Sequence, residues 1–273
     1  MTERRFHYVT PLIWPVLPAT YGALEIGLPI QKILDSRMDC PYDGPLRIDF
    51  TLHVDGERRS EDRVTCQVAG GRADPRDVWR RISHDRLGYL EAALSCDAPV
   101  FRRIDVSVGY ATLIGAHGSL NLIPDYKYAR PIIIEQISGI NRFCLMHAAA
   151  LVDRRRDSGN AYLMINPYSA DIVVRMRTAA GRTMRRRLAP RHATIVPLDE
   201  LVEDGEITAV MMTANNRFLA WDLRYALDDP TAINSIDHLE AFRGQATHRR
   251  VRLTDALKAT GRRGLDAMGL RVS

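Results

Sequence analysis

A chain of 273 residues, 46% of them hydrophobic and 26% charged, has the composition of a globular protein and is long enough to bury a substantial core. Its net charge of +5 argues against a protein dedicated to nucleic-acid binding, which gathers more positive charge on one face. The charge still permits an anionic ligand. No stretch reaches the roughly 20 apolar residues that a membrane-spanning helix needs, so no membrane span is predicted.

The N-terminal segment and the cysteines both favour a cytoplasmic location. Arg4 and Arg5 precede an apolar stretch, as in a signal peptide, but prolines and Glu25 interrupt that stretch. The cysteines lie far apart and form no Cys-x-x-Cys pair: Cys40, Cys66, Cys96 and Cys144. We interpret them as buried thiols in a reducing compartment.

In chain order, the first regular pattern predicts a β-hairpin. Residues 1–45 are rich in proline and glycine and indicate an extended lead-in. Apolar residues then alternate with polar ones from Ile48 to Val54, which is the period of a half-buried strand. Asp55-Gly56 follows, a strong signal for a hairpin turn, and residues 64–68 provide the return strand.

Two further segments precede the clearest β pattern. Asp74 and Pro75 have the residue types of a helix N-cap and a first helical position, so a short helix is expected over residues 75–82. Residues 130–152 form the most hydrophobic window of the chain. Because Gly139 divides this window, strands buried on both faces are favoured over a helix.

Residues 161–225 consist of short apolar runs of strand length that turn signals separate. These signals include Asn166-Pro167 and Ala180-Gly181, and apolar residues alternate with others over 172–177. Residues 198–202 predict one helical turn or a strand edge. Strands at spacings of roughly ten residues are typical of a sandwich or barrel. The order of turns and strands resembles an immunoglobulin-like or fibronectin-like module, which implies a β-sandwich and points to no particular family.

The two halves of the chain align without gaps over one stretch, which suggests an internal duplication. Glu91–Val108 lies over Thr208–Tyr225, with Phe101 on Phe218 and Asp105 on Asp222 as examples. The alternation of any two sandwich strands also produces some similarity, so duplication and chance both stay open.

These patterns predict a mainly β protein built from two related immunoglobulin-like β-sandwich units. The first unit is expected over residues 1–125, including the proline-rich lead-in, and the second over residues 126–230. An irregular, partly helical basic tail is expected over residues 231–273, with its helix at 254–265.

No metal site and no cofactor are predicted. His238-x-Glu240 followed by His248 has part of the spacing of a two-histidine, one-carboxylate iron site, but the second histidine of such a site normally comes much later. Cys144 and His147 are three residues apart, so on a strand their side chains point to opposite faces. A buried thiol and a buried histidine are therefore favoured over a nucleophile with its base.

Two runs of arginine are the predicted anion- or partner-binding residues: Arg154, Arg155, Arg156, Arg185, Arg186 and Arg187. If their loops gather at one end of the fold, they would attract phosphate groups, lipid headgroups or an acidic protein. The alternative is that each run lies on a solvated face of its own. Aromatic residues are not interleaved with the runs, as a single-strand nucleic-acid binder would require.

Two functions of different class follow from the sequence. The absence of a coherent catalytic set favours a non-catalytic binding or accessory protein, which contacts a protein or an anionic partner through sandwich loops or an edge strand. A homo-oligomer is also expected, because sandwich edges need pairing or protection, whereas sequence-specific nucleic-acid binding is disfavoured. The alternative is an enzyme with a site between the two halves that uses Asp105, Asp222, Tyr110 or His147.

Overall fold

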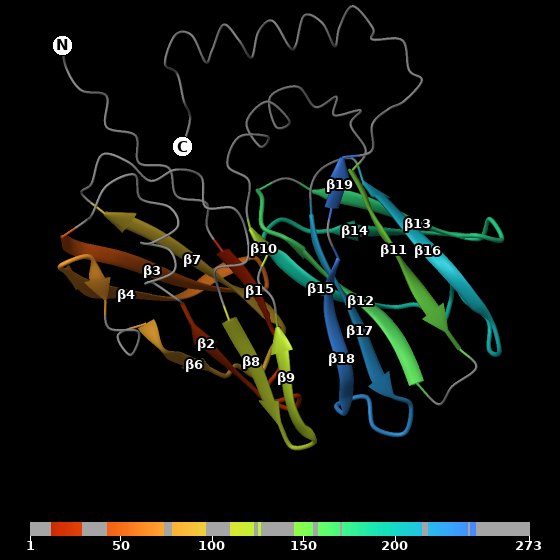
Figure 1. Cartoon of the computed structure of the whole chain (residues 1–273). Coiled ribbons are helices and arrows are strands. Elements are labelled where there is room, and N and C mark those ends of the chain that lie inside the picture. The colour runs from red at the N-terminus through yellow and green to blue at the C-terminus, as the bar shows by residue number, and fades with distance from the viewer. Residues whose placement is uncertain are drawn as a thin grey trace, which may run out of the picture.

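The structure is a computed structural model that describes residues 12–28, 43–73, 78–96, 110–122, 125–126, 145–154, 158–169, 171–214, 218–239 and 241–243. Throughout these ranges the chain forms antiparallel β-sheets and contains no α-helix (Figure 1). The prediction of a mainly β protein is therefore confirmed. Residues 130–144 of the hydrophobic window and the helix expected at 254–265 lie outside the described residues. The irregular tail expected from residue 231 is wrong at its start, because Ile233–Leu239 and Ala241–Arg243 are strands.

The strands of residues 12–126 form two sheets. The larger has the order β10-β1-β7-β3-β4-β5, and the smaller has the order β6-β2-β8-β9. Their strands are β1 (Leu12–Val16), β2 (Ala23–Gly27), β3 (Gly44–Val54), β4 (Glu57–Ala69), β5 (Arg72–Ala73), β6 (Arg80–Ile82), β7 (Gly88–Cys96), β8 (Tyr110–Gly115), β9 (Gly118–Leu122) and β10 (Asp125–Tyr126).

The strands of residues 145–243 form two more sheets, which we name by their positions. The central sheet has the order β15-β12-β17-β18, and the outer sheet has the order β14-β13-β16-β11-β19. Their strands are β11 (Leu145–Asp153), β12 (Ser158–Asn166), β13 (Ile172–Thr178), β14 (Thr183–Leu188), β15 (His192–Pro197), β16 (Ile207–Ala214), β17 (Leu219–Ala226), β18 (Ile233–Leu239) and β19 (Ala241–Arg243).

The hairpin between β3 and β4 forms where the sequence predicts it. Asp55 and Gly56 have φ angles of 52° and 80°, the left-handed conformation that a tight two-residue hairpin turn requires. A Cβ on Gly56 would also lie 2.6 Å from Cε1 of His192 in β15. Glycine therefore serves twice here, because it allows the turn and lets the hairpin approach the C-terminal half.

Other local predictions have mixed outcomes. Leu198–Val202 forms a single hydrogen-bonded turn, the first of the two predicted alternatives, in which the Val202 amide donates to the Leu198 carbonyl at 2.9 Å. The helix expected over residues 75–82 is wrong for its last turn, because Arg80–Ile82 is strand β6 and pairs with Leu24–Ile26 of β2. A pairing partner more than fifty residues away in sequence thus overrides the local helix signal.

The central sheet is buried on both faces, as its middle strand shows. Every residue of β12 from Gly159 to Asn166 is buried. Leu163 belongs to a first core together with Trp14 from β1, whereas its neighbour Met164 belongs to a second core with Met176 from β13. Figure 1 shows the same arrangement, with the central sheet between the N-terminal strands and the outer sheet.

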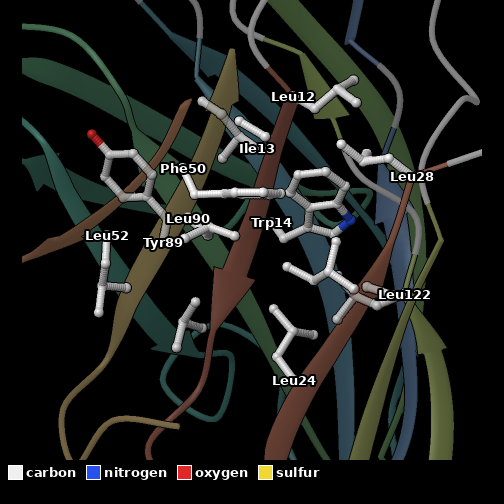
Figure 2. Close-up of a cluster of buried hydrophobic side chains, with 14 of the residues drawn as sticks. Leu12, Ile13, Trp14, Leu24, Leu28, Phe50, Leu52, Tyr89, Leu90 and Leu122 are labelled. Atoms are coloured by element: carbon white, nitrogen blue, oxygen red, sulfur yellow. The ribbon is translucent and has the colours of Figure 1, made fainter. Parts of the chain in front are cut away.

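The first core joins the two halves of the chain. Trp14 and Trp221 are both fully buried in it. Figure 2 shows the Trp14 ring among Leu24, Leu28 and Leu122 of the N-terminal half. The division of the chain at residue 125 and the internal duplication stay predictions, and residues 97–108 of the aligned stretch lie outside the described ranges.

We predict that Trp221→Ala lowers the free energy of unfolding by about 3–5 kcal/mol, because it removes a fully buried indole from the shared core. Denaturant unfolding measures the loss. Trp79→Ala is the control, since that side chain is 50% exposed and its removal costs much less. Native-state hydrogen exchange should show weaker protection in β3 and β7 as well as in β17. Weakening confined to β17 would contradict a core common to both halves.

Candidate functional site

The outward face of the outer sheet carries an array of arginines. The burial of β13 alternates strictly, so Ile172, Val174 and Met176 point into the second core while the intervening side chains face solvent. The same alternation holds in β14. The result is a basic face that consists of Arg175 and Arg177 on β13 and Arg185 and Arg187 on β14.

Three of these arginines have no acidic partner among the described residues. Arg187 donates to Asp171 at 2.6 Å, and this hydrogen bond holds the pKa of Asp171 below its usual range. The guanidinium groups of Arg175, Arg177 and Arg185 form no ion pair and no hydrogen bond with any part of the described chain. Arg175 and Arg185 are direct cross-strand neighbours, an arrangement of like charges that is unfavourable on its own.

Exposed apolar side chains adjoin the basic face. Leu151 of β11 and Ile207 and Met211 of β16 are 39% to 56% exposed, and we call them the apolar strip. Met211 lies directly opposite Arg177 in the sheet, so the strip and the basic face touch. Contiguous exposed apolar residues with a polar rim are typical of interaction surfaces.

The residues of the two predicted arginine runs lie in different surroundings. Arg154 is 13% exposed and forms ion pairs with Asp199 and Asp204, so it fastens the end of β11 to the 199–204 loop. Arg186 forms an ion pair with Glu200 of the same loop at 2.8 Å.

Arg154 and Arg186 therefore gather around one acidic loop. In contrast, Arg185 lies with Arg187 on the basic face. Arg155 and Arg156 lie outside the described residues. Of the six predicted residues, four are described, and Arg185 alone among these four has a guanidinium with no acidic partner.

The residues of the enzyme alternative are spread over the fold. Asp105 lies outside the described residues. Tyr110 begins β8 in the smaller N-terminal sheet, His147 lies in β11 of the outer sheet, and Asp222 lies in β17 of the central sheet. These three positions thus belong to three different sheets.

Asp222 is a buried carboxylate beneath the outer sheet. It is 4% exposed and lies opposite Tyr162 and Asp237 in the central sheet. Burial raises its pKa, and Arg224, which donates to Oδ2 at 3.3 Å, opposes that rise. Its Oδ1 has no hydrogen-bond partner within the described ranges. A carboxylate this enclosed does not meet a substrate in this conformation, but it can hold a proton at a higher pH than an exposed aspartate does.

A second group of titratable side chains, which the sequence analysis missed, lies on the larger N-terminal sheet. The rings of His53 and Tyr89 stack with centroids 4.6 Å apart, and His53 Nε2 lies 3.8 Å from a carboxylate oxygen of Glu91. Burial raises the pKa of Tyr89, whose hydroxyl has no hydrogen-bond partner in the described part of the chain. Both rings are buried, so the group is a packed polar cluster of the interior rather than an open site.

A small open groove lies between the β8–β9 hairpin and the loop before β18. Its volume is about 260 Å³, and its lining includes Tyr21, Ser119 and Asn234. At its rim His117 Nε2 lies 3.0 Å from a carboxylate oxygen of Asp229. The groove holds no nucleophile with an adjacent base, so its described lining supports contact with a small polar group rather than catalysis.

Metal and membrane sites find no support in the described ranges. They contain no group of three or more His, Cys, Asp or Glu residues that could hold a metal ion. His238 packs edge-on against Trp221, while Glu240 and His248 lie outside these ranges. Over the same residues no helix is long and apolar enough to cross a membrane.

Comparisons with known proteins found no matching family model, no similar curated protein and no similar solved structure. Arg175 and Arg177 of the basic face form no contiguous run in the sequence, so the sequence analysis, which singled out runs of arginine, missed them. The signal that could have found them is the period-two alternation of β13, which places both side chains on one face.

We predict that Asp222→Asn changes how stability depends on pH. Burial raises the folded-state pKa of Asp222 above the usual value for an aspartate, so its contribution to stability is present below that usual pKa and is lost as the pH rises through the folded-state pKa. The stability of the wild-type protein relative to Asp222→Asn should therefore fall as the pH increases above about 4.

Urea unfolding at a series of pH values measures this difference. Asp85→Asn is the control, because Asp85 is exposed and lies outside the central sheet. A difference that stays constant or grows with increasing pH would contradict the raised pKa.

Proposed function

We propose that this chain is a non-catalytic binding protein that docks an acidic protein partner on the outward face of its outer sheet. The observation that supports this most is the position of Arg175, Arg177 and Arg185 beside an exposed apolar strip, because these three exposed arginines have no acidic partner in the part of the chain that the structure describes. Several other exposed arginines, such as Arg63 and Arg86, have carboxylate partners.

The charge of the basic face sets the chemistry of the partner. A guanidinium presents a fixed fork of donors that matches a carboxylate, and a carboxylate between Arg175 and Arg185 would relieve the repulsion of two opposed cations. Each exposed ion pair contributes only about 0.2–1 kcal/mol. The arginines therefore orient the partner and raise the association rate, while burial of the apolar strip supplies much of the affinity.

The shape of the surface favours a protein over a membrane or a nucleic acid. The exposed apolar side chains lie on strands within a sheet face, not on a protruding loop or an amphipathic helix that could enter a bilayer. On the described strands β13, β14 and β16, no aromatic residue is available to stack on bases. A protein surface with carboxylates and apolar groups matches both parts of the face.

The finer description of the fold belongs to the same proposal. Each half of the chain contributes two antiparallel sheets, which is consistent with two related immunoglobulin-like sandwich units. Such modules commonly serve as binding scaffolds because loops and edges can vary without loss of the core. The expected compartment is cytoplasmic, on the strength of the cysteine spacing.

We predict that the double variant Arg175→Ala, Arg185→Ala binds poly-L-glutamate about tenfold more weakly than the wild type does. Two lost ion pairs of about 0.7 kcal/mol each correspond to such a factor. Isothermal titration calorimetry at low salt measures the dissociation constant, and binding should weaken as salt is added.

The matched control is Arg58→Ala, Arg81→Ala. It removes the same charge from exposed positions on β4 and β6, where both arginines already face carboxylates. Equal weakening by the two double variants would show that net charge alone attracts the polymer, and the proposed surface would then be wrong.

A further inference from the structure

The outer sheet ends at β14, and this edge has no strand partner within the described chain. β14 pairs with β13 on one side, and no described strand pairs with its other side. An unpaired edge presents a row of backbone donors and acceptors that can take up another strand.

The hydrogen-bond register shows which backbone groups face outward. The Thr178 amide donates to the Arg182 carbonyl at 3.0 Å, which makes these two residues a hydrogen-bonded pair of the β13–β14 hairpin. Bonded and non-bonded pairs alternate along an antiparallel ladder. The backbone groups of Thr183, Arg185 and Arg187 therefore point away from β13, toward the unpaired edge.

A side-chain contact supports this assignment. The carbonyl of Arg185 accepts a hydrogen bond from the guanidinium of its neighbour Arg186 at 3.3 Å. A carbonyl within the ladder would bond to β13 instead. The Arg186 side chain thus occupies an acceptor that an additional strand would use.

The outward backbone groups and the basic side chains belong to the same residues. Arg185 and Arg187 expose their guanidinium groups on the basic face while their amides face the edge. They lie about 7 Å apart along the strand, since each residue of an antiparallel strand advances about 3.4 Å. In a paired strand, side chains at alternate positions would lie about 5 Å from them.

From this coincidence we propose that the acidic partner adds an extended strand to the free edge of β14, with Asp or Glu at alternate positions opposite Arg185 and Arg187. This inference rests on the proposed function and specifies its docking mode. The carboxylate opposite Arg185 would also lie near Arg175, which is the cross-strand neighbour of Arg185. One segment would thereby satisfy both backbone and guanidinium groups.

A second copy of this chain is a poor occupant for the same edge. Antiparallel pairing of two β14 strands would bring arginines of residues 185–187 opposite one another, and like charges directly opposite are destabilising. The basic edge thus discourages self-association while it favours an acidic strand. The charges therefore select the partner.

The test uses synthetic peptides of alternating Glu and Val, about seven residues long, with the full-length protein. In antiparallel pairing, the amides of the Glu residues opposite Arg185 and Arg187 face β14 and the Val amides face solvent. N-methylation of the Glu amides should weaken binding about tenfold, as expected for the loss of two hydrogen bonds of about 0.7 kcal/mol each. N-methylation of the Val amides should change it less than about twofold.

Each outcome of the peptide series either supports strand addition or overturns it. Strand addition is supported if N-methylation of one set of amides weakens binding and N-methylation of the other set does not. This holds for either strand direction, because in a parallel strand the Val amides face β14 and the Glu amides face solvent. Equal effects of both sets, with binding still weakened by Arg175→Ala, Arg185→Ala, would overturn strand addition and leave the proposed function standing. Failure of the unmodified peptide to bind, while poly-L-glutamate binds, would also overturn this docking mode.

Discussion

The burial of the central sheet on both of its faces is the constraint on which the rest of the structure depends. Strands β12 and β17 send alternate side chains into two cores, so Leu163 and Trp221 pack with the N-terminal half while Met164 and Ala220 pack with the outer sheet. Loss of this double packing would expose both cores at once. The outer sheet, in contrast, needs only one face for the fold, and its other face is left to solvent.

The solvent-exposed face of the outer sheet differs in its charge pattern from a surface that binds nothing. A solvated strand face commonly alternates charges of both signs, yet β13 and β14 place Arg175, Arg177 and Arg185 together with no carboxylate partner among the described residues. Several arginines elsewhere in the described chain pair with carboxylates, as Arg154 with Asp199 and Asp204 illustrates. The contrast within one molecule is the physical basis for assigning the binding role to this face and to its edge.

The sequence predicted those features that local chemistry controls. The Asp55-Gly56 turn and the alternation of β13 follow from conformational preference and period, and both are confirmed. Features that depend on distant pairing were not predictable in this way. β6 replaced part of an expected helix because it pairs with β2, and Arg175 joins Arg185 only through the register of two strands. A contiguous run of arginines was also a misleading guide, because a strand turns Arg186 away from its neighbours on either side.

Hydrogen exchange of the intact protein with and without poly-L-glutamate tests the central claim most directly, because it locates the contact without any substitution. The account predicts added protection of backbone amides in β13, β14 and β16, and no change in β3 and β4, which lie in another sheet. Protection that falls instead on β3 and β4, or that spreads evenly over the arginine-containing strands, would contradict a binding role for the basic face.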